Sequence, residues 1–165
     1  MLKRISLCVT SSLVLACAPA AHAHIVDNVL EHSAPNAALQ LTPIGSHESG
    51  VLGKSAAEIV AYHAASQRVL TVNARSGEID ILDASDPTQP QKIGAISAGG
   101  DKEINSVAVR PDGLAVAAVQ QADKTDNGEA LFFNAATGQE LGRVGVGALP
   151  DNCLLYTSPS PRDRQ

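Results

Sequence analysis

Three side chains with oxygen ligands recur at similar spacing along the chain and could bind a hard cation together. Glu58, Asn105 and Asp151 each stand near the start of a β-rich segment, at matching positions of an internal repeat. Calcium binds carboxylate and amide oxygens that can come from separate loops. The pattern therefore predicts a calcium site at Glu58, Asn105 and Asp151. Short polar side chains at such positions can also hydrogen-bond turn amides, so a structural role is the alternative interpretation.

Further polar residues precede the two repeated groups of β-rich segments. His47 and Glu48 lie before the first group, and Asp101 and Glu103 lie before the second. These residue types can bind metals or transfer protons, although solvated loop residues are more common. The sequence has neither the HExxH spacing of zinc enzymes nor the GxSxG motif of serine hydrolases. No catalytic residue is therefore predicted.

Composition argues against several classes of protein. The chain of 165 residues has 12 Lys plus Arg against 17 Asp plus Glu, a net charge of -5, with 44% hydrophobic and 2% aromatic residues. Nucleic-acid binding needs clustered cations, so no nucleic-acid partner is predicted. The hydrophobic content is also too high for a disordered chain. One folded domain, or part of a larger one, is expected.

Residues 1–23 have the order of a secretory signal peptide: a basic start, an apolar segment too short to span a bilayer, and the small-x-small site Ala21-His22-Ala23. We expect cleavage after Ala23 and a protein that is secreted, periplasmic or on the cell surface. An alternative interpretation is a lipoprotein, because Val14-Leu15-Ala16-Cys17 resembles a lipobox and would attach a lipid to Cys17. Residues 24–43, which follow the predicted signal peptide, are predicted to form an N-terminal extension.

Residues 153–165 are predicted to be non-native. The string CLLYTSPSPRD, which begins at Cys153, resembles a translated sequencing adapter, and its two Ser-Pro pairs would break a strand. A genuine Pro/Ser-rich tail is the alternative. The cysteines Cys8, Cys17 and Cys153 all lie in the terminal segments. Neither a disulfide framework nor a thiolate site is therefore predicted.

Eight short β-rich segments position the candidate ligands. Turn residues separate these segments: Ser76-Gly77 and Asp112-Gly113 predict tight hairpins, and Asp126-Asn127-Gly128 predicts positive φ angles. The expected strands are 57–62, 68–73, 78–83, 92–97, 104–110, 114–120, 129–134 and 140–146.

The eight segments form two groups of four that match after a shift of about 46 to 51 residues, a spacing typical of propeller blades. The first predicted blade spans about 56–97, the second about 103–146, and a third begins at 147–152. The predicted fold is all-β: a partial β-propeller over 44–152, with four antiparallel strands in each blade and truncation after about two blades. A β-sandwich is the alternative fold.

Several motifs carry a family resemblance. Ala56–Tyr62, Asn105–Val109 and Val146–Asp151 together resemble the opening of the bacterial choice-of-anchor I domain, and Ile81–Pro87 is similar to the LVIVD repeat of surface propellers. The resemblance spans about Ile44 to Asp151. It implies a secreted or surface-attached propeller whose C-terminal sorting signal varies among members. Members of the family are often labelled alkaline phosphatase-like without an assigned mechanism.

Two functions remain open from the sequence. The first is a noncatalytic binding or scaffold propeller outside the cytoplasm, with an unidentified extracellular ligand or surface component as its partner. The second is a metal-dependent phosphoesterase or related hydrolase, with carboxylates from several blades at a central channel. Membrane contact would require lipidation of Cys17 or a C-terminal anchor. Because no catalytic motif is present, the sequence favours the first function.

Overall fold

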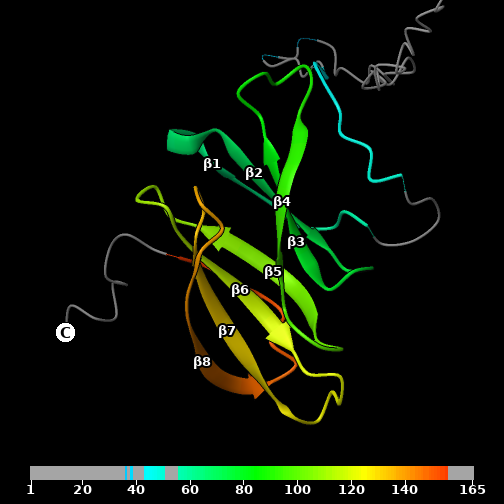
Figure 1. The fold of residues 1–165 in the computed structure, drawn as a ribbon, viewed down its shortest axis with the longest axis vertical. Helices are drawn as coiled ribbons and strands as arrows, with labels where there is room; N and C mark the ends of the chain where they lie inside the picture. Colours follow the sequence, from blue (N-terminus) through cyan, green and yellow to red (C-terminus); the bar gives the residue numbers. More distant parts are fainter. Residues whose placement is uncertain (1–35, 37, 39–42, 51–55, 156–165) are drawn as a thin grey trace, which may run out of the picture.

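The fold consists of two four-stranded antiparallel sheets (Figure 1). The computed structural model describes residues 36, 38, 43–50 and 56–155. The predicted all-β fold is confirmed. The predicted signal peptide with Cys17, and the part of the predicted adapter-like tail from 156 onward, lie outside the described residues. The first sheet contains β1 (Val60–His63), β2 (Arg68–Asn73), β3 (Glu78–Asp83) and β4 (Gln91–Ser97), and the second contains β5 (Glu103–Val109), β6 (Leu114–Gln120), β7 (Asn127–Asn134) and β8 (Glu140–Ala148).

Each sheet is a meander in which every strand pairs with the next strand of the chain. The order is β1-β2-β3-β4 in the first sheet and β5-β6-β7-β8 in the second. Two such sheets fit either two propeller blades or a sandwich. The predicted bounds of β2, β3 and β6 agree with the structure. At the outer strands the structure differs from the predicted bounds. β1 begins at Val60 rather than at residue 57, and β8 continues to Ala148 rather than ending at residue 146.

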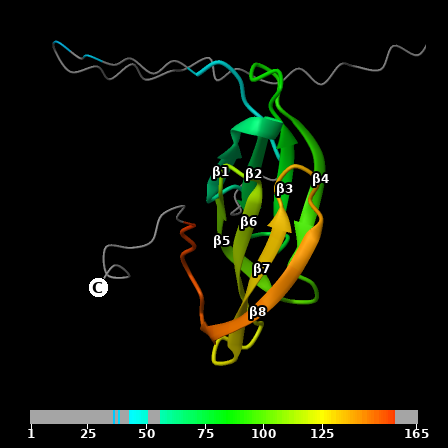
Figure 2. The same cartoon turned by 90° about the vertical axis from the view of Figure 1, so that its left-hand side faces the viewer.

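Strand alternation brings one face of each sheet into a shared core. In β2 and β3, Leu70 lies opposite Ile81 and Val72 lies opposite Ile79, so these four buried side chains share one face. The first strand of the second sheet, β5, lies against β1, β2 and β3. Figure 2 shows the two sheets overlapping as layers. Burying each large apolar side chain stabilises the fold by about 1.5–3 kcal/mol. The second sheet contributes Ile104, Val107, Ala115, Ala117, Val119, Leu131 and Phe133 to the core.

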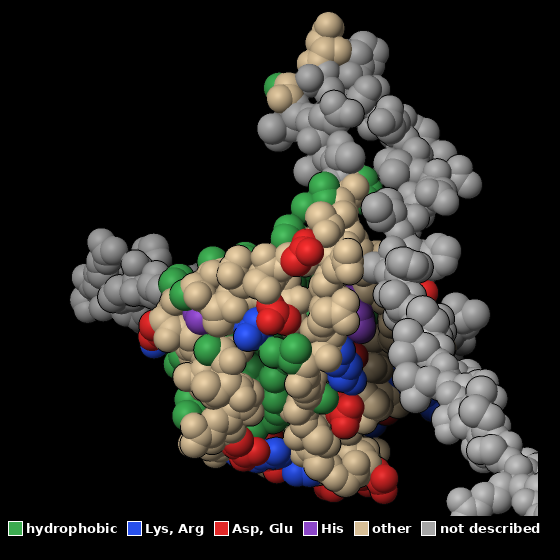
Figure 3. All heavy atoms as spheres, turned by 45° about the horizontal axis from the view of Figure 1, so that its top comes forward, with side chains coloured by type: hydrophobic (Ala, Val, Ile, Leu, Met, Phe, Trp, Pro, Cys, Tyr) green, Lys and Arg blue, Asp and Glu red, His purple; other side chains and the backbone are tan. Residues whose placement is uncertain are grey.

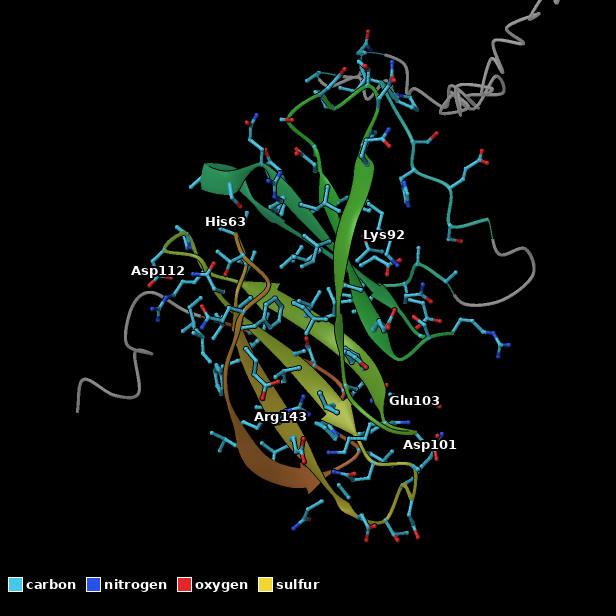
Figure 4. All side chains as sticks on the ribbon, in the orientation of Figure 1. His63, Lys92, Asp101, Glu103, Asp112 and Arg143 are labelled. Atoms are coloured by element: carbon cyan, nitrogen blue, oxygen red, sulfur yellow. The ribbon has the colours of Figure 1, made fainter. Side chains whose placement is uncertain are left out.

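A buried histidine links the two sheets. The short 3-10 helix η1 (Ala64–Ser66), which the sequence does not predict, follows His63 at the end of β1. The Nε2 atom of His63 lies 3.3 Å from the carbonyl oxygen of Pro111, and Nδ1 lies 2.6 Å from Ser66 Oγ. A carbonyl oxygen only accepts, so Nε2 donates to Pro111 and Nδ1 accepts the Ser66 hydroxyl. His63 therefore joins β1 to the turn between β5 and β6 (Figure 4).

Two glycines in equivalent hairpins make the same kind of close contact. A Cβ atom on Gly77 would lie 2.5 Å from the carbonyl oxygen of Lys102, and one on Gly128 would lie 2.5 Å from Cδ of Pro150. Lys102 precedes β5 and Pro150 follows β8, so each hairpin touches the segment that leaves its own sheet. Gly77 has a φ of 64°. The positive φ predicted for Asp126-Asn127-Gly128 is wrong, because close approach rather than backbone conformation requires glycine there.

Candidate functional site

The three predicted calcium ligands have different surroundings. Glu58 is exposed just before β1, and its backbone N–H donates to the carbonyl oxygen of Val72 at 3.1 Å. Asn105 is half-buried in β5, and Asp151 is exposed after β8. Asn105 lies beside the segment that contains Asp151, because its Nδ2 donates to the carbonyl oxygen of Pro150 at 2.9 Å. Among the hydrogen bonds of the described residues, none joins Glu58 to the other two, so their convergence stays a prediction.

Asn105 belongs to a hydrogen-bonded chain across β5 and β6. Its Nδ2 also donates to Gln120 Oε1 at 2.9 Å, and Gln120 Nε2 donates to the carboxylate of Glu103. Gln120 is only 5% exposed, so these bonds satisfy polar groups with little access to water. Because both amide hydrogens of Asn105 are used, only its Oδ1 is left to coordinate a cation. Asn105 therefore has a structural role whether or not an ion binds.

A cluster of three charged side chains that the sequence does not indicate lies at the linker between the sheets. Glu129 in β7 accepts from Lys102 Nζ at 2.8 Å and from Arg143 Nη1 at 3.0 Å. The hydrogen bond from Lys102, followed by the one from Arg143, lowers the pKa of Glu129 below its ordinary value. Arg143 Nη1 also donates to the carbonyl oxygen of Ala98 at 2.8 Å. These contacts hold the linker that joins β4 to β5.

A pocket of about 590 Å³ lies on the face of the first sheet that points away from the shared core. Its floor is formed by Val69, Thr71, Asp80 and Leu82, which alternate along β2 and β3 with the core residues. Residues 45–50 form one wall and include two predicted candidates, His47 and Glu48. The other two predicted candidates, Asp101 and Glu103, are exposed near the start of β5 in the second sheet (Figure 4).

The charge at the floor of this pocket is already paired. Asp80 is 5% exposed, and its Oδ1 lies 2.7 Å from the ammonium of Lys92. Its other oxygen, Oδ2, accepts from Asn73 Nδ2 at 3.2 Å. A buried carboxylate is tolerated when a cation and hydrogen bonds compensate it. The floor of the pocket therefore presents a neutral ion pair and apolar side chains, whereas the wall contributes the carboxylate of Glu48.

Within the described ranges, no group of three or more His, Cys, Asp or Glu side chains is arranged to hold a metal ion. An amide oxygen such as Asn105 Oδ1 lies outside that set of residue types. Calcium at Glu58, Asn105 and Asp151 accordingly stays a prediction that rests on the sequence repeat.

The calcium prediction has a direct thermal test. An ion that binds only the folded protein stabilises it by RT ln(1 + c/Kd), where c is the free ion concentration, so the melting temperature rises with ion concentration. Adding calcium should therefore raise the melting temperature, and Glu58→Gln should reduce that increase while leaving the ion-free melting temperature nearly unchanged, because Glu58 is exposed. Asp126→Asn, which removes one carboxylate at an exposed position outside the candidate ligands, is the matched control and should keep the full increase. Absence of any increase in the unmodified protein would contradict a calcium site.

The family model of the choice-of-anchor I domain matches residues 58–157, which is more than half of the chain. The match begins just before β1 and covers both sheets. It also continues past Cys153, so it overlaps the first residues of the predicted adapter-like tail. No curated protein matches the chain.

Proposed function

Because the chain belongs to the choice-of-anchor I domain family, we propose that it acts as a noncatalytic binding or scaffold module outside the cytoplasm. Proteins with choice-of-anchor domains are typically extracellular or attached to the cell surface. The proposed arrangement is a β-propeller to which the two described sheets contribute consecutive blades. Its partner would be an extracellular ligand or a component of the cell surface.

This proposal rests on the hydrogen bonds that the polar side chains make within the fold. The amide of Asn105 binds Gln120 and Pro150, and the carboxylate of Glu129 binds Lys102 and Arg143. A general acid, general base or nucleophile must instead reach a substrate from within a cleft. These groups join strands and linkers to one another, which is what a rigid scaffold requires.

Export is supported by the sequence. The basic, apolar and small-x-small order of residues 1–23 supports transport across the membrane and removal of that segment after Ala23. Among the described residues, no helix has the length and apolar character needed to cross a bilayer.

A hydrolysis assay tests the noncatalytic role against the phosphoesterase alternative. The secreted chain, incubated with a chromogenic phosphomonoester and with calcium, magnesium or zinc in turn, should show no turnover above the buffer blank. The Glu58→Gln variant should behave in the same way. Turnover by the unmodified chain that Glu58→Gln abolishes would overturn the proposal, because it would place a predicted metal ligand in a working catalytic site.

A further inference from the structure

Within the two described sheets, shifts of strand register occur only where an outer strand takes part. The central pairs, β2 with β3 and β6 with β7, keep one register from end to end. The pairs of β3 with β4, β5 with β6 and β7 with β8 each contain a shift of the kind that a β-bulge produces. The remaining outer strand, β1, has only four residues. Every outer strand of these sheets is therefore either bulged or short.

The bulges of β4 and β8 occupy the same position of the repeat. Lys92 and Gly94 lie opposite consecutive residues of β3, so Ile93 between them is the extra residue. Leu141 is the extra residue of β8 in the same way, because its two neighbours lie opposite consecutive residues of β7. The repeat aligns Ile93 with Leu141. The bulge is therefore a property of the repeat and not an irregularity of one strand.

The free edges of β4 and β8 need protection. Each strand is the last of its sheet, and both lie along the same side of the molecule in Figure 2. In the proposed propeller the last strand of each blade forms the outer rim, which no neighbouring blade covers. β8 has nine residues, and its Leu141 and Val144 are 57% and 56% exposed. Figure 3 shows that apolar side chains reach the molecular surface among charged ones. A long edge with exposed apolar side chains is a site where a strand of another chain can add.

We propose that the bulges at Ile93 and Leu141 block the addition of a strand from another chain to the edges of β4 and β8. A bulge bends its strand and increases the local twist, so the edge no longer presents the straight row of N–H and C=O groups that an incoming strand needs. Free cations are another common protection of edges. Lys92 of β4 and Arg143 of β8, however, are already paired with carboxylates of their own sheets. This protection is independent of the proposed binding or scaffold role.

Deletion of Leu141 tests the effect of the bulge. The deletion makes the register of β7 with β8 continuous from Glu129 to Phe133 and leaves every other pair as it is. The variant should associate through β8, so light scattering coupled to size-exclusion chromatography should give an average mass about twofold or more above that of the unmodified chain at equal concentration. Leu141→Ser is the matched control. It keeps the bulge and removes the exposed apolar side chain, so its mass should equal that of the unmodified chain.

Two further variants separate edge pairing from unfolding. Adding Val144→Lys to the deletion of Leu141 should restore the mass of the unmodified chain, because an exposed lysine on an edge opposes strand addition. Deletion of Ile93 repeats the test in the first sheet and should also cause association. Circular dichroism should show that both deletion variants keep their β-sheet content.

Three results would overturn the proposal. The first is a pair of folded deletion variants that keep the mass of the unmodified chain. The second is association of Leu141→Ser, or association that Val144→Lys does not reverse, because the contact would then lie elsewhere than at the unprotected edge. The third is loss of β-sheet content in both deletion variants, which would mean that the bulges are required by the sheets themselves.

Discussion

Replacing Val107 with aspartate should unfold the protein, whereas the same change at Val60 should leave it folded. Val107 is 5% exposed and packs in the core between the sheets. Burying an unpaired carboxylate there costs several kcal/mol, and the lost burial of valine adds about 1.5 kcal/mol. The total approaches the whole stability of an ordinary domain, about 5–15 kcal/mol. Val60 is 66% exposed, so an aspartate at that position stays hydrated.

Urea denaturation followed by circular dichroism measures both effects. Val107→Asp should show no cooperative transition or a midpoint near zero denaturant, and the Val60→Asp midpoint should lie close to that of the unmodified protein. Both substitutions replace valine with aspartate. The sequence repeat aligns Val60 of β1 with Val107 of β5, so the two positions are equivalent in their sheets. Equal destabilisation by both variants would mean that the two sheets do not pack through the core described above.

Local pattern was enough to predict most strands. The segment Glu78–Asp83 intersperses three branched apolar residues with three acidic ones, and the hairpin residues Ser76-Gly77 precede it. Such patterns depend on neighbours along the chain, and the structure places β3 at the predicted residues. The outer strands were harder, because the end of an edge strand depends on how the next sheet or linker packs. The end of β8 at Ala148, beside the contact of Gly128 with Pro150, is an example.

The repeat alone could not show which copies of a position are buried. Val60 and Val107 look alike in sequence, and only the packing of β5 against the first sheet makes one of them a core residue. The contacts of Glu129 were hidden for a similar reason, since Lys102 and Arg143 reach it from the linker and from β8. The partner of Asn105 is a backbone carbonyl, at Pro150, which residue types do not reveal. Long-range contacts of this kind determine what the candidate site can do.

Gly77→Ala should destabilise the protein strongly, while Gly145→Ala should change its stability little. Gly77 has a φ of 64°, and an added Cβ atom would lie 2.5 Å from the carbonyl oxygen of Lys102. The backbone conformation alone costs about 1 kcal/mol for an L-residue, and the overpacked contact adds about 1–3 kcal/mol. At Gly145 no atom lies within 4 Å of the added Cβ, so the expected change is within about 0.5 kcal/mol.

Limited trypsin digestion separates this contact from a general loss of stability. Lys102 lies in the linker that Gly77 touches, so pushing that linker away should expose the peptide bond after Lys102 and speed cleavage there. Gly128→Ala would crowd Pro150 at the equivalent hairpin, so it should destabilise the protein without the same selective cleavage after Lys102. If Gly77→Ala and Gly128→Ala gave identical digestion patterns, the two hairpins would not act on separate linkers. Selective cleavage in Gly77→Ala alone would instead show that the hairpin at Gly77 holds the linker that leaves the first sheet.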